Sequence, residues 1–283
     1  MTAPPPLSPI ILEPIVRLAL AEDLGRAGDL TTDATIPAGK TMTCFLNARM
    51  DGRLAGLDAA EYALKLIDPN VVPTLQMSDG DELTSGNLIA RLEGPARSIL
   101  IAERTMLNFV GRLSGIATLT AQYVDAVKET GAKIVCTRKT TPGHRALEKR
   151  AVRCGGGTSH RYGLDDAILI KDNHIAASGS IGEALSRAKD YAGHLRMIEI
   201  EVDTLEQLEE ALPFEPDAVL LDNMSTDELR DAVSIVKGRC KTEASGGVTL
   251  ETVSDIASTG VDFISVGALT HSAINLDVGL DAD

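Results

Sequence analysis

Tryptophan is absent from the 283-residue chain, and phenylalanine and tyrosine together make up only 3% of it. The core must therefore be built from aliphatic side chains, which are plentiful because 44% of the residues are hydrophobic. Scarce aromatics argue against a nucleic-acid partner, since single-stranded sites stack bases on aromatic rings. The formal net charge of −14 argues against anionic membrane surfaces as well.

The four cysteines are far apart in the sequence and form no Cys-x-x-Cys pair. Neither a disulfide framework nor a zinc site is expected from them. The opening residues MTAPPPLSPI lack the basic start and apolar core of a secretory signal. No apolar run approaches the roughly 20 residues that a membrane span requires. We therefore predict a cytoplasmic protein with reduced thiols and no membrane partner.

The first part of the chain predicts a small α+β domain, because short strand-like and helix-like segments are mixed there. The expected helices cover residues 11–20, 58–67 and 96–113, and the expected strands cover 41–49, 71–77 and 87–92. From about Lys133 the pattern changes to short apolar strands alternating with helices of about ten residues. These strands lie at 134–137, 167–170, 197–200, 218–221, 242–244 and 263–266. Six such units indicate a parallel sheet that forms a barrel or part of one.

The residues that follow these six strands are charged, polar or glycine. In chain order the strand ends carry Arg138-Lys139, Lys171, Glu201, Asp222, Ser245-Gly246-Gly247 and Gly267-Ala268. In a (β/α) barrel the carboxyl ends of all strands meet at one mouth, where catalytic groups lie. Any one of these residues could instead face solvent in a loop, but the full set indicates a site.

Basic residues are concentrated between Arg138 and Arg161, where seven lysines and arginines accompany one acid, Glu148. The cluster is interleaved with three consecutive glycines, and it is closed by His160 and Arg161. It suits a small ligand with several negative charges. The alternative is a solvated basic helix face, which charge runs often are.

Glycine-rich loops follow the last two predicted strands, the usual position in barrels for a phosphate held by backbone N–H groups. The carboxylates Glu201 and Asp222 could accept hydrogen bonds from sugar hydroxyls or bind Mg²⁺, which takes oxygen ligands. Each could also neutralise a lysine of the barrel, and the two interpretations are compatible. The five histidines show no ligand spacing, so we expect no transition-metal site.

Eight segments form a pattern that covers nearly the whole chain. They are GDLTT from Gly28, ERTMLNFVGRLSGIAT from Glu103, TRKTTPGHRALEKRAV from Thr137, GGGTSHRYGL from Gly155, IKDNHI from Ile170, LLDN from Leu220, ASGGVT from Ala244 and DFISVGAL from Asp262. The pattern resembles that of the quinolinate phosphoribosyltransferase family. The resemblance implies a pentosyltransferase that joins quinolinate to 5-phosphoribosyl 1-pyrophosphate (PRPP) with Mg²⁺, and then releases CO₂ to give nicotinate mononucleotide.

The same resemblance implies an N-terminal α/β sandwich domain over residues 1–112, joined by the tail 272–283, and an incomplete α/β barrel over 113–271. It also implies a homodimer with active sites at the subunit interface. The quinolinate site would then contain Arg104, Arg138, Lys139, His160, Arg161 and Lys171, with Arg49 from the partner subunit. Glu201 and Asp222 would meet the ribose hydroxyls and the metal, and Ser245, Gly246, Gly247, Gly267 and His271 the 5-phosphate. Thr137, Val266 and Ala268 complete the expected substrate-binding set, in which Lys139, Lys171, Glu201 and Asp222 are the catalytic residues.

Two features depart from this family pattern. His144 and Arg150 stand where more apolar or aromatic residues are expected, so the rim of the cationic pocket could differ. The tail also ends in LDVGLDAD, without a basic and aromatic finish.

Three other functions fit part of the sequence. A paralogous protein of molybdate-transport gene clusters would share the phosphoribosyl site, but Arg104 and the TRKTTPG and HR motifs favour the quinolinate enzyme. A non-catalytic phosphate sensor could keep the glycine loops without the charged strand ends. An aldolase could form a Schiff base on Lys139 or Lys171, because crowding with arginines can activate a lysine.

Overall fold

The computed structural model describes residues 4–283, which divide into two compact units. Of these residues, the first unit contains 4–121 together with 140–156 and 269–283. The second contains residues 122–139 and 157–268. The boundary at Ala121 lies nine residues beyond the expected end of the first domain at 112, inside a long helix, and residues 140–156 are grouped with the first unit instead of the barrel.

The first unit is built on a four-stranded antiparallel sheet with the strand order β12-β1-β5-β3. The strands are β1 (Thr41–Ala48), β3 (Val72–Leu75), β5 (Leu88–Pro95) and β12 (Val278–Ala282), and β2 (Gly52–Arg53) pairs separately with β4 (Glu82–Leu83). The helices are α1 (Pro9–Leu24), α2 (Leu30–Thr35), α3 (Leu57–Ile67), α4 (Ala96–Val127), α5 (Arg145–Cys154) and α11 (Ala268–His271). Leucine, isoleucine, valine and alanine side chains from this sheet, α3 and α4 form one buried core, as the lack of aromatics predicted.

The C-terminal tail belongs to the first unit, because β12 pairs with β1 in antiparallel register from Cys44–Ala282 to Ala48–Val278. The segment before β12 lies directly on α4. A Cβ atom at Gly115 would lie 2.0 Å from the backbone oxygen of Ile274, so only glycine allows this approach.

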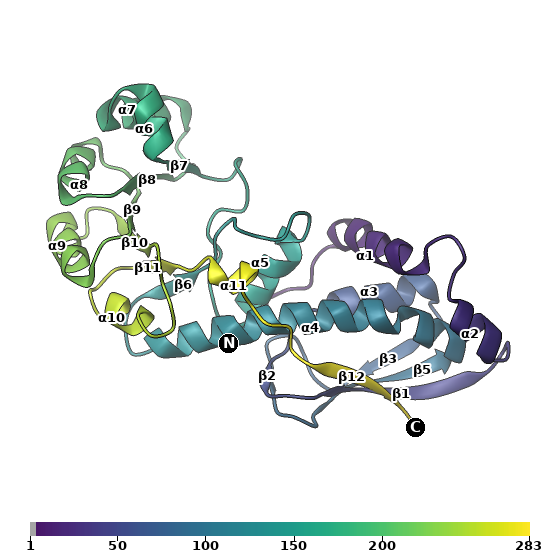
Figure 1. Cartoon of the computed structure of the whole chain (residues 1–283). Helices are drawn as coiled ribbons and strands as arrows, with labels where there is room; N and C mark the ends of the chain where they lie inside the picture. Colours follow the sequence, from purple (N-terminus) through teal and green to yellow (C-terminus); the bar gives the residue numbers. More distant parts are fainter. Residues whose placement is uncertain (1–3) are drawn as a thin grey trace. The chain divides into compact units, whose positions relative to one another are not determined.

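The second unit is a six-stranded, fully parallel sheet with the order β6-β11-β10-β9-β8-β7. Its strands are β6 (Lys133–Val135), β7 (Ile168–Ile170), β8 (Ile198–Val202), β9 (Ala218–Asp222), β10 (Lys241–Ser245) and β11 (Phe263–Ser265). The intervening helices are α6 (Asp172–Ser178), α7 (Ile181–Tyr191), α8 (Leu205–Ala211), the 3₁₀ turn η1 (Leu212–Phe214), α9 (Thr226–Val236) and α10 (Val253–Ala257). Figure 1 shows α7, α8, α9 and α10 along the outer side of the curved sheet, with β6 and β7 at its two edges. The prediction of an incomplete parallel barrel after a small α/β domain is confirmed.

Four helices were not predicted: α2, α5, α6 and the short α11. The segment of α5 reads RALEKRAVRC, and its charges concealed the apolar stripe of Leu147, Ala151 and Val152 that packs inward. Helix α4 also continues to Val127, well past the predicted end near Leu113. Among residues 4–283, no helix combines the length and the apolar character that crossing a bilayer would require.

Candidate active site

A pocket of about 350 Å³ lies at the carboxyl ends of the six parallel strands of the second unit. Side chains alternate between the two faces of a strand, so residues two apart share a face. Leu169 and Lys171 therefore face the pocket from β7, and Leu220 and Asp222 face it from β9. The complete lining is Thr137, Arg138, Lys139, His160, Arg161, Leu169, Lys171, Glu201, Leu220, Asp222, Glu243, Ser245 and Ser265.

Nine of the predicted site residues are brought together in this lining. Each predicted strand end contributes at least one of them, except the loop after β11, where Ser265 takes this place. They are Thr137, Arg138, Lys139, His160, Arg161, Lys171, Glu201, Asp222 and Ser245. The polar residues predicted at the strand ends therefore do lie around one pocket, as expected for the carboxyl ends of a parallel barrel.

Four cations line the pocket: Arg138, Lys139, Arg161 and Lys171. Burial lowers the pKa of the Arg161 guanidinium, and repulsion from Arg138 lowers it further. Like charges held this close indicate a site that is completed by an anion. Lys171 is paired with a carboxylate of the same lining, because its Nζ atom lies 2.5 Å from Oε2 of Glu201 on the adjacent strand.

The loop after β10 approaches the end of β9 very closely. Gly246 has φ +94°, and a Cβ atom on it would lie 2.1 Å from Oδ1 of Asn223. The backbone N–H of Asn223 donates to the carbonyl oxygen of Ser245 at 2.9 Å, and its side chain donates to Oδ2 of Asp222 at 2.7 Å. The glycine is thus required by both its backbone conformation and the space around it.

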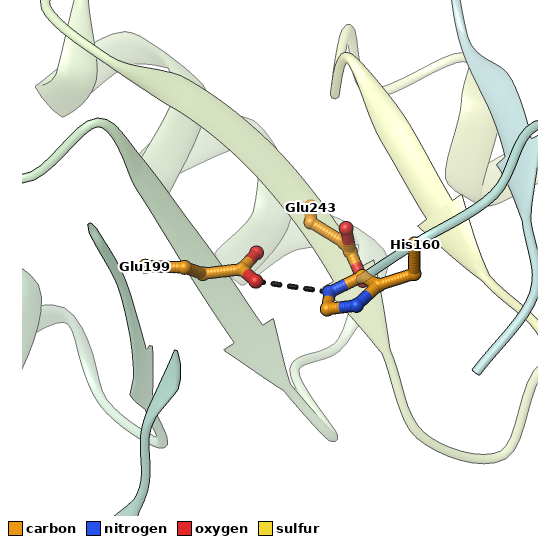
Figure 2. Close-up of side chains that lie close together, drawn as sticks. All are labelled: His160, Glu199 and Glu243. Atoms are coloured by element: carbon orange, nitrogen blue, oxygen red, sulfur yellow. Dashed lines mark hydrogen bonds and ion pairs between the residues drawn. The ribbon is translucent and has the colours of Figure 1, made fainter. Parts of the chain in front are cut away.

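Two acidic residues of this region were not predicted, Glu199 on β8 and Glu243 on β10. Figure 2 shows their carboxylates converging on the ring of His160. His160 Nε2 lies 2.9 Å from Glu199 Oε2 and 3.6 Å from Glu243 Oε1. The signal in the sequence was a glutamate inside each of the strands IEIEV and KTEAS, at the positions that share a face with Glu201 and Ser245.

Three predicted site residues belong to the first unit, and they do not line this pocket. Arg49 is exposed, and its guanidinium pairs with Asp281 of the tail at 2.7 Å. Arg104 is exposed on α4. His271 is exposed at the end of α11, where its Nδ1 lies 2.7 Å from the hydroxyl of Ser272.

The remaining predicted residues lie in the loops after β10 and β11 or, for Ala268, at the start of α11, and they are not among the lining side chains. They are Gly246, Gly247, Val266, Gly267 and Ala268. Val266 is 1% exposed, and its backbone N–H donates to the carbonyl oxygen of Val135 at 2.9 Å. Its side chain is therefore part of the core, so it could reach a ligand only through its backbone.

The interpretation of residues 138–161 as one cationic cluster was wrong for its middle part. Arg145, Lys149, Arg150 and Arg153 belong to α5 in the first unit. Arg150 is 9% exposed, pairs closely with Asp79 and lies 3.4 Å from Asp58. The alternative of a solvated helix face holds for Arg153, which is exposed, but not for Lys149, which is only 1% exposed.

The two unusual residues of this segment have structural partners in the first unit. Arg150 forms the buried ion pairs just described. The ring of His144 stacks on Phe109 of α4, with 6.3 Å between ring centres. Neither residue lines the strand-end pocket.

Comparison with known proteins gives a consistent result over both units. Residues 29–114 match the family model described as "Quinolinate phosphoribosyl transferase, N-terminal domain", and residues 116–281 match that of the C-terminal domain. The chain is 48% identical over 271 residues to a nicotinate-nucleotide pyrophosphorylase [carboxylating] of Mycobacterium leprae, covering 94% of this chain and 95% of the relative. It is 46% identical over 260 residues to a probable enzyme of the same description from Bacillus subtilis, covering 92% and 89%. The solved nicotinate-nucleotide pyrophosphorylase of Francisella tularensis superposes with a TM-score of 0.95 at 39% identity and covers 100% of both chains.

Proposed function

The chain belongs to the quinolinate phosphoribosyltransferase family, and from this premise we propose that it joins quinolinate to the ribose of PRPP in the pocket at the strand ends. The transfer releases pyrophosphate. Loss of the 2-carboxylate as CO₂ then gives nicotinate mononucleotide, the product that feeds NAD biosynthesis. The enzyme is thus a decarboxylating pentosyltransferase.

The observation that carries this proposal is the ring of four cations around a pocket of about 350 Å³. Quinolinate is a dicarboxylate and PRPP carries phosphate at both ends, so a site that binds both must present several fixed cations. Arg138 and Arg161 suit carboxylates, because a guanidinium can donate two parallel hydrogen bonds. Lys139 supplies a point charge on the exposed side of the pocket.

Chemistry at C1 of the ribose needs orientation and charge compensation more than a covalent nucleophile. The ring carbon becomes cation-like as pyrophosphate leaves, and negative charge grows on the leaving group. Glu201 and Asp222, on neighbouring strands, can hold the ribose hydroxyls while Lys139 and Lys171 meet the negative charge. The protein thereby converts a bimolecular displacement into a reaction between two oriented groups.

The 2-carboxylate becomes easier to lose once the ring nitrogen is quaternary, because the positive nitrogen stabilises the electron pair left on C2. The residues around the pocket then need to hold the ring and exclude water. Leu169 and Leu220 supply the apolar part of the lining.

The donor set also fits Mg²⁺, which prefers carboxylate oxygens and keeps water and phosphate in its shell. One oxygen of Glu201 is used by Lys171, and one oxygen of Asp222 accepts from the Asn223 side chain at 2.7 Å. Each carboxylate has a second oxygen. We therefore propose that Glu201 and Asp222 hold Mg²⁺, which would neutralise charge on the departing pyrophosphate.

We further propose a cytoplasmic homodimer in which first-unit residues of one copy complete the site of the other. What supports this is that Arg49 and Arg104 are exposed cations of the first unit, apart from the lining of the pocket. His271 is also an exposed residue of the first unit outside the lining, and we propose that it contacts the 5-phosphate of PRPP. Sedimentation analysis, together with complementation between an Arg104→Ala chain and an Arg161→Ala chain, tests the shared site.

The decisive experiment is incubation with quinolinate, PRPP and Mg²⁺. We expect pyrophosphate, CO₂ and nicotinate mononucleotide in equal amounts. Binding of phosphoribosyl compounds without turnover would instead indicate a sensor, and turnover with another aromatic acid alone would indicate the paralogous activity. Borohydride inactivation in the presence of a carbonyl substrate would indicate an aldolase, which the ion pair of Lys171 with Glu201 does not favour.

A further inference from the structure

The reaction proposed above needs a proton that its substrates do not supply. When the bond between C2 and the carboxylate carbon breaks, CO₂ leaves without the bonding electrons, and the pair stays on C2. Nicotinate mononucleotide carries hydrogen at this carbon. A donor must therefore deliver one proton to C2, and this inference rests on the proposed function.

His160 is poorly suited to be this donor in the observed arrangement. Its Nδ1 accepts the backbone N–H of Arg161 at 2.8 Å, so Nδ1 carries no proton. Its Nε2 must then carry the ring proton, and that N–H donates to Glu199 at 2.9 Å. The ring is thus held as the neutral Nε2–H tautomer, with both nitrogens engaged.

The same tautomer argues against a metal ion here. One ligand atom from each of His160, Glu199 and Glu243 lies within 4.8 Å of the others, a spacing that could hold an ion. A neutral imidazole that binds metal through Nε2 carries its proton on Nδ1. The Arg161 N–H points at Nδ1, so the two hydrogens would collide.

Glu243 has a different environment. It is 4% exposed, although it borders the pocket. Among residues 4–283 its Oε1 has no hydrogen-bond partner, since the 3.6 Å to His160 Nε2 exceeds hydrogen-bonding distance. A buried carboxylate oxygen without a donor is costly, and a protonated carboxyl group, which carries no charge, costs less in the same place.

The groups that face Glu243 come from three other segments. They are Glu199 of β8, His160 of the loop before β7, and Ser265 of β11. Burial has the largest effect on the Glu243 pKa and raises it, and repulsion from Glu199 raises it further. His160 and the Ser265 hydroxyl act in the opposite direction, and the result is a pKa of about 7.

We propose that Glu243 is the general acid of the decarboxylation step and gives its proton to C2 of the pyridine ring. The C2–carboxylate bond breaks and CO₂ departs, the electron pair on C2 takes the proton from the Glu243 carboxyl group, and Glu243 becomes a carboxylate. Water regains access after product release and returns a proton to Glu243. Glu199 is a positioning residue, because it fixes the His160 ring and its charge favours the protonated form of Glu243.

Glu243→Gln tests this step, because the amide keeps the shape of the side chain and cannot donate a carboxylic proton. In a single turnover we expect pyrophosphate release within a few-fold of the wild-type rate. Formation of nicotinate mononucleotide should slow by about 10²–10⁴-fold, the range for loss of a general acid. The ribosylated dicarboxylate should accumulate. Glu243→Asp, which retains an acid, should recover part of the rate.

The pH dependence of CO₂ release distinguishes a general acid from a residue with a purely structural role, because only the general acid adds its own pKa to the profile. The wild-type rate of CO₂ release should fall as the pH rises through about 7, the pKa of Glu243, and this limb should be missing from Glu243→Gln. In Glu199→Gln the limb should move to lower pH, because the repulsion that favours protonated Glu243 is removed.

If the variants fail to fold, infrared spectroscopy of the wild-type protein can still test whether a carboxyl group is protonated near neutral pH. The band of a protonated carboxylic acid should be present at pH 6 and lost above pH 8. Its absence at pH 6, or a Glu243→Gln enzyme with wild-type product formation and pH profile, would overturn the assignment. A wild-type protein that releases neither pyrophosphate nor CO₂ would overturn the proposed function itself, which separates the two failures.

Discussion

Lys171 Nζ and Glu201 Oε2 lie 2.5 Å apart, where the neighbouring parallel strands β7 and β8 end. The sequence had left two roles open for Glu201, contact with ribose and metal or neutralisation of a barrel lysine. The ion pair fulfils the second role, and it leaves the first to the other carboxylate oxygen.

Lys171→Ala should therefore affect activity far more than stability. The Lys171 side chain is 44% exposed, and such ion pairs contribute about 0–1 kcal/mol to folding. The same change removes a cation that we propose faces the leaving group, so kcat should fall by at least about 100-fold, as when one transition-state donor is lost. Urea unfolding and steady-state kinetics measure the two effects. A stability loss that matched the activity loss would contradict this prediction.

Arg161→Ala should strongly lower kcat/KM for quinolinate and leave the fold intact. When a charged side chain that pairs with a buried group of a ligand is truncated, binding typically weakens by about 2–5 kcal/mol. For Arg161 this corresponds to a loss of roughly 30- to 5,000-fold in kcat/KM for quinolinate. Arg161→Lys is the matched control. It restores the charge without the two parallel hydrogen bonds, so it should recover only part of the activity.

The two glycines after β10 should respond differently to alanine. At Gly246 the new Cβ atom would lie 2.1 Å from Asn223 Oδ1, whereas at Gly247 nothing lies within 4 Å and only the φ of +60° is unfavourable. Gly246→Ala should therefore displace Asn223 beside Asp222 and raise the KM for PRPP by about tenfold or more, equivalent to about 1.4 kcal/mol. Equal KM values for the two variants would show that this loop does not contact PRPP through its fixed shape.

Arg150→Met should lower the free energy of unfolding by about 3–5 kcal/mol, because it leaves the buried carboxylates Asp58 and Asp79 without their cation. Arg17→Met is the control. The ion pair of Arg17 with Glu13 is 62% and 43% exposed, so its loss should cost less than about 1 kcal/mol. Urea titrations of the two variants against wild type give the comparison.

Glu243 should also make stability depend on pH. Its pKa is about 7 in the folded protein, against 4.5 for an ordinary glutamate. Between these values the folded state keeps a proton that the unfolded chain has released, so the free energy of unfolding falls as the pH rises. The full effect is on the order of 3 kcal/mol. Glu243→Gln should remove this slope and be the more stable protein at pH 8, as measured by thermal or urea unfolding at pH 5 and pH 8.

Local patterns predicted much of the second unit. The helices predicted between the strands are found as α7, α8, α9 and α10, and the six predicted strands correspond to β6 to β11 within a few residues. This success has a physical cause, because a strand buried on both faces must be short and apolar while its crossover helix is amphipathic. The polar residues after each strand then had to meet at one edge, which places Arg138, Lys171 and Asp222 in one lining.

The sequence alone thus determined the fold class, the family and most of the pocket, since these follow from strand order and from motifs read along the chain. Only the tertiary structure decided the partners of individual charges. Arg138 and Arg150 look alike in the sequence, yet one faces the pocket and the other is buried against Asp79. Glu199 and Glu243 are 44 positions apart, and their convergence on His160 depends on the packing of β8, β9 and β10 side by side. Burial and neighbouring charge, which decide whether an acid keeps its proton, arise only when distant segments pack together.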